Sequence, residues 1–269
     1  MTPPAENASL VALVTGASRG LGRAMAQGLL AAGYPVVAMA RPGSEAALES
    51  LLQPQDASRE RLLCLTGDIC SEETCREILA RACEHFGTVH ALVNNAALGM
   101  DLVGPQVSKP RPFFDVDSAL WRSIVDTNIN GTFTMSKVVV PHLLAQGWGR
   151  VVNLSTQFGT MQRAGFSPYG PSKAAVEAMT VAWAKELAGT GVTANVLLPG
   201  GAADTAMIPH EDFADRSRLV RPQAMVPPLL WLLSRASDGV TGRRFTAKNW
   251  SPLAPLAEAI ASSGAQAGW

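Results

Sequence analysis

Neither sign of charge is in excess in this sequence. Its 269 residues include 22 lysines and arginines and 22 aspartates and glutamates, so the formal net charge is zero. Binding duplex nucleic acid as a main role needs clustered cations, so this balance argues against that role. Every apolar stretch is broken well before the roughly 18 residues that a membrane helix needs, and residues 1–9 lack the pattern of a secretory signal. We therefore expect a cytoplasmic protein with neither a nucleic acid nor a membrane as its partner.

Cysteine is scarce and follows no metal-binding pattern. None of the four cysteines forms a CxxC pair, and no cysteine–histidine spacing suggests zinc. This favours reduced thiols and no metal site. The four are Cys64, Cys70, Cys75 and Cys83.

Apolar residues are plentiful, at 47% of the chain, which is enough for a substantial core. Apolar runs alternate with helical patterns along the chain, and this order implies a parallel sheet covered by helices on both faces. We expect a single α/β domain over residues 1–269, a doubly wound sheet of about seven strands. The expected strands are 10–15, 35–39, 62–66, 89–93, 150–154, 192–198 and 244–246. The expected helices are 20–32, 44–52, 71–85, 118–146 (continuous or broken near Gly131), 171–188 and 222–234.

A glycine-rich turn, Thr15-Gly-Ala-Ser-Arg-Gly-Leu-Gly22, joins the first expected strand to the first helix. Glycine lets a backbone approach a pyrophosphate closely, and a helix N-terminus presents free N–H groups to an anion. The spacing is G-x-x-x-G-x-G, which is neither G-x-G-x-x-G nor a Walker A loop. In this position it favours a dinucleotide site over a plain tight turn.

Two arginines bear on the choice of dinucleotide. About 20 residues beyond the turn, such sites place either an acid on the ribose hydroxyl or an arginine on a 2′-phosphate. Here that position is Arg41, and Arg19 lies within the turn itself. Two guanidinium groups without a carboxylate favour NADP(H) over NAD(H). The alternative is that both arginines are solvated surface residues.

Tyr169, one of only two tyrosines, is followed four residues later by Lys173. That spacing puts both side chains on one helix face, although Pro171 disfavours helix at Gly170. A nearby ammonium stabilises a phenolate, so we expect the tyrosine pKa to fall from about 10. Such a phenol can protonate a carbonyl oxygen or accept a proton from an alcohol. Taken alone, a YxxxK match is common by chance.

With its other motifs in order, the chain resembles the classical short-chain dehydrogenases/reductases (SDR) from about Leu10 to Gly242. The resemblance implies a Rossmann-type fold, nicotinamide-dependent chemistry on a small carbonyl or alcohol substrate, and a homo-oligomer, either dimer or tetramer. The matching motifs are the glycine-rich turn, Gly67-Asp68-Ile69, Asn94-Asn95-Ala96, Asn128 before Gly131, Tyr169 to Lys173, and Pro199-Gly200.

The resemblance also implies four catalytic residues. Tyr169 would be the general acid/base, Lys173 would bind the nicotinamide ribose and lower the tyrosine pKa, and Asn128 would keep a water in the proton relay. Thr156 occupies the register of the family's catalytic serine, with Ser155 as the alternative. The threonine methyl group would crowd the pocket.

The implied cofactor-binding residues run from the glycine-rich turn to the segment after the sixth expected strand. Asp68 would bind the adenine beside Ile69, Asn94 the adenosine side, and Thr205 the carboxamide. The full set is Gly16, Ser18, Arg19, Gly20, Leu21, Gly22, Arg41, Asp68, Ile69, Asn94, Asn95, Ala96, Tyr169, Lys173, Pro199, Gly200 and Thr205.

The C-terminal region departs from the family pattern. Gly242-Arg-Arg-Phe-Thr-Ala-Lys-Asn-Trp250 stands where family members carry an acidic Gly-Gly stretch. We expect a substrate lid at 200–221 and an irregular segment at 249–269. The sequence thus predicts an NADP(H)-dependent oxidoreductase that interconverts a ketone and a secondary alcohol. The alternatives are a non-catalytic dinucleotide sensor, or a dehydratase or epimerase on a similar scaffold.

Overall fold

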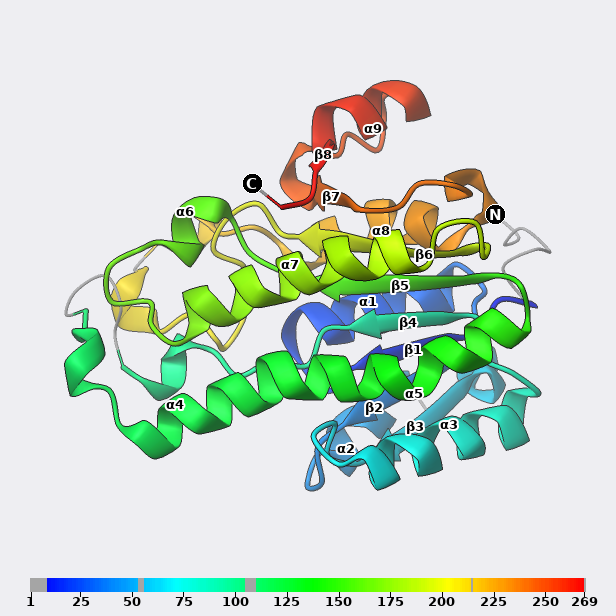
Figure 1. The fold of residues 1–269 in the computed structure, drawn as a ribbon, viewed down its shortest axis with the longest axis horizontal. Helices are drawn as coiled ribbons and strands as arrows, with labels where there is room; N and C mark the ends of the chain where they lie inside the picture. Colours follow the sequence, from blue (N-terminus) through cyan, green and yellow to red (C-terminus); the bar gives the residue numbers. More distant parts are fainter. Residues whose placement is uncertain (1–8, 53–55, 105–109, 214, 269) are drawn as a thin grey trace.

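The computed structural model describes residues 9–52, 56–104, 110–213 and 215–268 (Figure 1). Within these residues, eight strands form one sheet in the order β3-β2-β1-β4-β5-β6-β7-β8. All neighbouring pairs are parallel except β7 and β8. The strands are β1 Ala12–Thr15, β2 Val36–Ala40, β3 Leu62–Thr66, β4 Ala91–Asn94, β5 Gly149–Leu154, β6 Val192–Leu198, β7 Arg243–Thr246 and β8 Gly264–Gln266.

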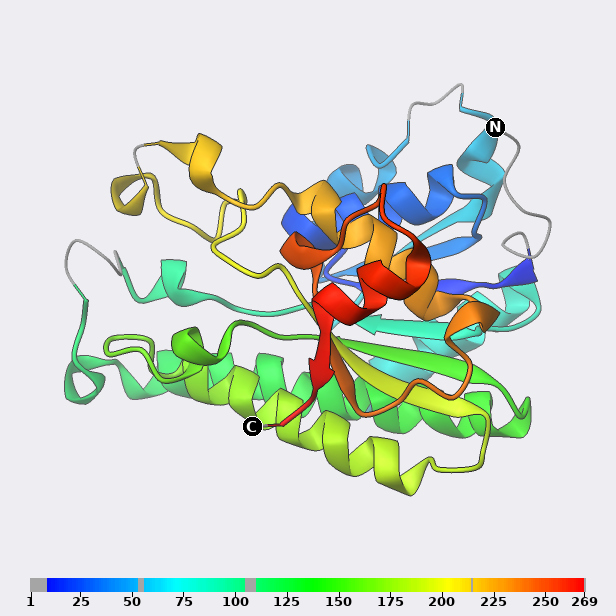
Figure 2. The same cartoon turned by 90° about the horizontal axis from the view of Figure 1, so that it is seen from above.

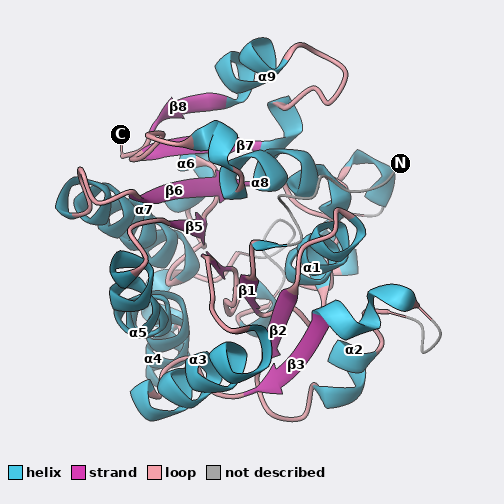
Figure 3. Cartoon of the chain, turned by 90° about the vertical axis from the view of Figure 1, so that its right-hand side faces the viewer, coloured by secondary structure: helices cyan, strands magenta, loops and turns pink. Residues whose placement is uncertain are grey.

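Helices cover both faces of the sheet, as Figure 3 shows edge-on. Successive residues of β1 serve the two layers: Ala12 and Val14 pack with α1 and α8, whereas Leu13 packs with α3 and α5. No helix among the described residues is both long and apolar enough to cross a membrane. The helices are α1 Gly20–Ala31, α2 Glu45–Glu49, α3 Glu72–Phe86, α4 Ser118–Val125, α5 Thr132–Ala145, α6 Phe158–Met161, α7 Tyr169–Glu186, α8 Val226–Leu233 and α9 Leu256–Ser263.

The expected doubly wound parallel sheet is confirmed, but the count of about seven strands was one too low. The additional strand, β8, lies in the C-terminal segment that we expected to be irregular. It pairs antiparallel with β7, with Arg244 opposite Ala265, and α9 precedes it. Its three residues carry no strand pattern of their own. Pairing with a neighbour, which a local pattern does not reveal, makes them a strand.

The helical stretch expected at 118–146 is continuous rather than broken at Gly131. A π-helical turn, Asp126–Gly131, joins α4 to α5. A β-carbon on Gly131 would lie 2.6 Å from the Ile69 side chain, so glycine lets the loop after β3 pack against this turn. The expectation that Pro171 disfavours helix at Gly170 was also wrong. Helix α7 begins at Tyr169 and includes Pro171 in its first turn.

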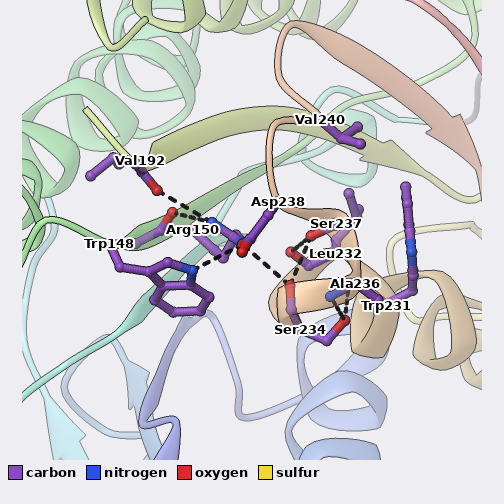
Figure 4. Close-up of polar contacts among 12 residues, drawn as sticks. Trp148, Arg150, Val192, Trp231, Leu232, Ser234, Ala236, Ser237, Asp238 and Val240 are labelled. Carbon is purple, nitrogen blue, oxygen red and sulfur yellow. Dashed lines mark hydrogen bonds and ion pairs between the residues drawn. The ribbon is translucent and has the colours of Figure 1, made fainter. Parts of the chain in front are cut away.

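At the amino end of β5, the buried guanidinium of Arg150 connects the sheet to the segment after α8 (Figure 4). It forms an ion pair with Asp238, which also accepts a 3.0 Å hydrogen bond from the indole of Trp148. The Arg150 guanidinium lies 4.1 Å from the centroid of that indole ring. It also donates to three backbone carbonyls, those of Gly149, Gly191 and Ser234.

The opposite end of the sheet is where the segments after β4, β5 and β6 gather, at the left of Figures 1 and 2. These are the carboxyl ends of the parallel strands. In open α/β sheets, ligands bind beyond this edge.

Candidate active site

The glycine-rich turn packs directly against the chain that leaves β4. The Thr15 hydroxyl accepts 3.0 Å hydrogen bonds from the backbone amides of Asn95 and Ala96, and the Asn95 side chain donates to the carbonyls of Thr15 and Gly16. Gly16 has a φ of +67°, and a β-carbon there would lie 2.8 Å from the Ala96 backbone. A β-carbon on Gly22 would collide with the Gly16 carbonyl and the Asn95 side chain. These glycines are thus already required by the protein's own packing.

Helix α1 begins at this turn with no negative charge and no side-chain cap. Its N-cap, Arg19, makes no capping hydrogen bond, and the first turn holds no acidic residue. Ser18 is partly exposed on the turn, and Leu21 packs partly buried against the core. A helix N-terminus with this composition is suited to an external anion.

Arg19 and Arg41, the two arginines predicted to bind the cofactor, lower the pKa of a carboxyl group that the sequence motifs did not indicate. Asp101 follows β4 in the short turn Met100–Leu102. Burial raises its pKa, while the charges of Arg19 and Arg41 act in the opposite direction. The structure therefore brings the two exposed arginines within electrostatic range of the same acidic side chain.

The segment after β6 crosses over the glycine-rich turn. The Thr205 side chain would lie 3.2 Å from a β-carbon on Gly20, and the Met207 side chain packs against Gly99. Gln157 donates a 2.9 Å hydrogen bond to the Gly200 carbonyl and so ties this segment to the end of β5. Pro199, just before it, accepts from the backbone amide of Lys248.

Arg216 holds this crossing segment at three points. Its Nε donates to the Asp204 carboxylate at 2.8 Å, and its two terminal nitrogens donate to the carbonyls of Thr205 and Ile208. Asp204 also pairs with Arg221. Sequence reasoning missed Arg216, because two of its three partners are backbone carbonyls and the third, Asp204, shares no motif with it.

Asn128 lies fully buried in the π-helical turn and holds the loop after β4. Its amide oxygen accepts from the Leu98 amide at 2.8 Å, and its nitrogen donates to the Leu98 carbonyl and to the Ser172 hydroxyl. Ser172 precedes Lys173 on α7. The asparagine therefore links this loop to the helix that carries the tyrosine–lysine pair.

Tyr169 and Lys173 share one side of α7, as their spacing predicts. The lysine nitrogen lies 5.9 Å from the centroid of the tyrosine ring and donates a 3.0 Å hydrogen bond to the Leu154 carbonyl. The tyrosine packs among apolar side chains of the loop after β4 and of α4. Burial lowers the pKa of Lys173 to about 8.

The expected lowering of the tyrosine pKa is wrong in this structure. Burial raises the pKa of Tyr169 to about 12, and the charge of Asp101 adds to this rise. The ammonium of Lys173 favours the phenolate, but burial of the phenol disfavours its charged form. The carboxylate of Asp101, which only the fold brings near, disfavours the phenolate as well.

Thr156 and Ser155, the two candidate hydroxyls, differ in their surroundings. Ser155 is buried, and its hydroxyl donates to the Lys173 carbonyl at 3.3 Å and to Glu177 at 3.5 Å, so it faces into α7. Thr156 follows it with a partly exposed side chain beyond the last residue of β5. Adjacent extended residues point to opposite sides, which favours Thr156 as the hydroxyl that meets a substrate.

Asp68, Ile69 and Asn94, also predicted to bind the cofactor, follow or end strands of the sheet. Asp68 is exposed after β3 and accepts from the Cys70 amide, and Ile69 is buried behind it. Asn94 instead faces the interior, where it donates to Ser136 and Asn153 and joins β4 to α5 and β5. These two hydrogen bonds stabilise the end of β4. The binding of a cofactor by Asn94 stays a prediction.

Comparison with known proteins connects this site to a family. The family model for short chain dehydrogenases matches residues 10–213. Nodulation protein G of Azospirillum brasilense is 34% identical over 86% of this chain and 94% of its own length. Acetoacetyl-CoA reductase of Cupriavidus necator is 30% identical over 88% and 95%, respectively.

Solved structures agree with these sequence matches. A 3-ketoacyl-(acyl-carrier-protein) reductase from Brucella melitensis, complexed with NADH, has a TM-score of 0.75 and 26% identity, covering 86% of this chain and 93% of its own. A short chain dehydrogenase from Shigella flexneri, complexed with NADP, has a TM-score of 0.77 and 25% identity, covering 90% and 99%. This chain therefore belongs to the short-chain dehydrogenase/reductase family of oxidoreductases.

Proposed function

We propose that this chain is an NADP(H)-dependent oxidoreductase that interconverts a ketone and a secondary alcohol, with Tyr169 as the general acid/base. The convergence of Tyr169 with Lys173, Asn128 and Thr156 beside the glycine-rich turn carries the proposal. Glycine turns and buried lysines occur separately in many proteins. Their meeting at the carboxyl ends of β1, β4 and β5 supports redox catalysis over binding alone.

The chain's own groups suit proton transfer to a carbonyl oxygen. With a pKa of about 12, Tyr169 is protonated at neutral pH and can donate its proton as the alkoxide forms. Lys173, with a pKa of about 8, exchanges protons near neutral pH and can restore the tyrosine. Thr156 would orient the substrate carbonyl by a hydrogen bond. Asn128 would hold a water molecule of the proton relay.

The residues around the turn fit a dinucleotide phosphate. The uncapped N-terminus of α1 supplies amide donors for a pyrophosphate, and Arg19 and Arg41 supply two cations for a 2′-phosphate. When bound, such a cofactor supplies or accepts the hydride. Relatives complexed with NADH and with NADP support a nicotinamide cofactor, and the two arginines support the phosphorylated form.

The region around Tyr169 suits an uncharged carbonyl compound. Met100, Val103, Ile124 and Phe166 share an apolar cluster with Tyr169, and the segment held by Arg216 crosses the glycine-rich turn. We propose that residues 200–221 act as the substrate lid. Because one relative is an acetoacetyl-CoA reductase, 3-oxoacyl compounds are the first substrates to assay.

We also propose that the protein acts as a homo-oligomer. Ala178 and Ala182 leave small exposed positions on α7, and Phe133 on α5 is 48% exposed. Small residues allow helices to approach closely, and exposed aromatic rings are typical of protein interfaces. Light scattering should give the mass of a dimer or a tetramer.

Replacing Tyr169 by phenylalanine tests the proposed activity. We expect turnover of 3-oxo esters with NADPH to fall by roughly 10²–10⁴-fold, the range for losing a general acid. Tyr34→Phe removes the other phenol and should leave turnover within about twofold, because Tyr34 lies in the core under α1. Near-normal turnover by Tyr169→Phe would refute the proposal. NADPH binding without turnover on a broad carbonyl panel would favour the sensor alternative.

Cofactor preference is tested separately by Arg41→Gln. The change should weaken NADPH binding roughly tenfold or more, as expected for loss of a charged hydrogen bond, and leave NADH affinity nearly unchanged. Quenching of intrinsic fluorescence measures both dissociation constants. Equal losses for the two cofactors would count against the arginine argument.

A further inference from the structure

A fully buried carboxylate lies one helical turn beyond the proposed catalytic lysine. Glu177 on α7 has no exposed surface. Burial raises its pKa, while Arg244, a hydrogen bond from the Gly268 backbone and the Ser155 hydroxyl act in the opposite direction. Burying an ionisable group is costly, so its partners indicate why it is kept.

Arg244 on β7 connects this carboxylate to the end of β5. Its Nη1 lies 3.3 Å from Oε1 of Glu177, and its Nη2 donates a 3.2 Å hydrogen bond to the carbonyl of Thr156. Oε1 makes no hydrogen bond within the described residues, so the guanidinium is its partner through charge. One guanidinium thus bridges the helix of the tyrosine–lysine pair and the residue at the catalytic-serine register.

The C-terminal segment closes the same cluster. Strand β8 pairs with β7 beside Arg244, and the backbone of Gly268 reaches the Glu177 carboxyl. Ala267 is buried against Val196 and Leu198 of β6. The segment lies beyond residues 10–213, which the family model matches.

We propose that Arg244, anchored by Glu177, is a positioning residue that sets the backbone of Thr156 relative to Lys173. This inference rests on the proposed function. A planar guanidinium can bond a carbonyl with one nitrogen while a carboxylate fixes its orientation. Thr156 lies two residues beyond Leu154, the last residue of β5, and the Arg244 hydrogen bond to its carbonyl holds its backbone in place. A buried pair supports a site in this way without adding to stability.

A double-mutant cycle between Arg244→Met and Thr156→Ala tests the mechanism. If Arg244 acts through Thr156, its loss should lower kcat/KM by roughly tenfold or more in the wild-type background, and by less than about threefold once the hydroxyl is gone. A merely structural role would lower kcat/KM by the same factor in both backgrounds. Equal factors would therefore overturn the inference.

Arg243→Met is the matched control. Arg243 is the preceding residue of β7, and its Nε donates to the Ala265 carbonyl of β8 instead. Its loss should leave kcat/KM within about twofold in both backgrounds. An effect as large as that of Arg244→Met would assign the loss to weakened β7–β8 pairing, which also overturns the inference.

Glu177→Gln and Arg244→Lys keep the test decisive if Arg244→Met does not fold. Gln removes the anchoring charge, and Lys keeps the charge but lacks the fork that serves both partners. Each variant should lower kcat/KM by a larger factor when Thr156 is present than in the Thr156→Ala background. Equal factors in the two backgrounds for both variants would contradict the inference.

Tyr169→Phe distinguishes failure of the proposed function from failure of the role of Arg244. Retained turnover there refutes the proposed function, whereas abolished turnover with an additive cycle refutes only the role of Arg244.

Discussion

Two buried cations lie at opposite ends of strand β5, and only one of them is paired with a carboxylate. At its amino end, the Arg150 side chain is 1% exposed and is paired with Asp238. At its carboxyl end, Lys173 is 4% exposed and donates to the Leu154 carbonyl. Burial lowers the pKa of both, but only for Arg150 does a neighbouring carboxylate oppose the change.

This difference separates a structural charge from a chemical one. Arginine does not lose its proton in proteins, so a buried arginine must be neutralised by its surroundings. A buried lysine can instead shift its pKa into the working range, here to about 8. Leaving Lys173 without a carboxylate costs stability and provides a group that exchanges protons, a trade typical of active sites.

The largest expected effect is that of Lys173→Met. Turnover should fall by roughly 10²–10⁴-fold, because the proton relay loses its ammonium. Stability at neutral pH should rise by about 2 kcal/mol, because a desolvated cation is removed. Urea unfolding and steady-state kinetics on the same preparation measure both changes. Lys185→Met, at an exposed position of the same helix, should change neither.

The pH dependence sharpens this prediction. The folded pKa of Lys173, about 8, lies below its ordinary value of 10.5, so the unfolded chain binds more protons between these values. Wild-type stability should therefore rise relative to Lys173→Met as the pH increases from 8 towards 10.5, and the difference should be constant below 8. A variant less stable than the wild type at neutral pH would show that Lys173 is well solvated or paired.

Next in size is an asymmetry at the Arg150–Asp238 pair. Asp238→Asn leaves a buried guanidinium without its counter-charge and should cost about 2 kcal/mol, an amount reduced by the 53% exposure of the aspartate. Arg150→Met removes the buried charge itself, and Asp238 can turn to water, so it should cost less than about 1 kcal/mol. Urea midpoints with unchanged m-values check both.

Arg235→Met is the control for this pair. Arg235 is exposed, and its guanidinium lies 5.0 Å from the Trp148 ring, so losing it should change the unfolding free energy by less than about 0.5 kcal/mol. If Arg150→Met proves more destabilising than Asp238→Asn, packing of the arginine stem on Trp148 outweighs the uncompensated charge.

Local patterns were sufficient for the parts of this molecule that depend on neighbours in sequence. The apolar runs predicted seven of the strands, and the Tyr169–Lys173 spacing predicted a shared helix face because a helix brings residues four apart together. The strand β8 was missed because its pairing with β7, not its composition, makes it a strand. The π-helical turn was not predicted, because π-helical geometry has no residue signature. The sequence indicated only a possible break of the helix near Gly131.

The environment of the site could not be read from the sequence for a related reason. Asp101 is one ordinary acid in a loop until the fold brings it near Tyr169, and it then opposes the pKa change expected from Lys173. Arg244 and Glu177 are 67 residues apart and belong to no common motif. Roles that follow from the spacing of residues within one helix or motif could be predicted. The pKa of a group that depends on charges distant in the sequence could not.

The smallest expected effect is at acid pH, where His90 supports the start of β1. Its Nδ1 accepts a 3.1 Å hydrogen bond from the Val11 amide, a role that only the neutral ring can fill. Burial lowers the pKa of His90, and the charges of His142 and Arg235 lower it further. Because the unfolded chain then binds more protons, stability should be lost as the pH falls below about 6.5.

Two substitutions at His90 separate the proton from the hydrogen bond. His90→Asn keeps an acceptor near the Val11 amide but does not titrate, so the loss of stability between about pH 6.5 and 5 should be smaller by about 1 kcal/mol. His90→Phe should remove the same pH dependence but cost about 1–2 kcal/mol at every pH, because a buried amide loses its partner. Urea titrations at a series of pH values measure both. If His90→Asn retains the full wild-type slope, the acid sensitivity arises elsewhere, and the comparison of the two ends of the sheet must then include another group at the amino end.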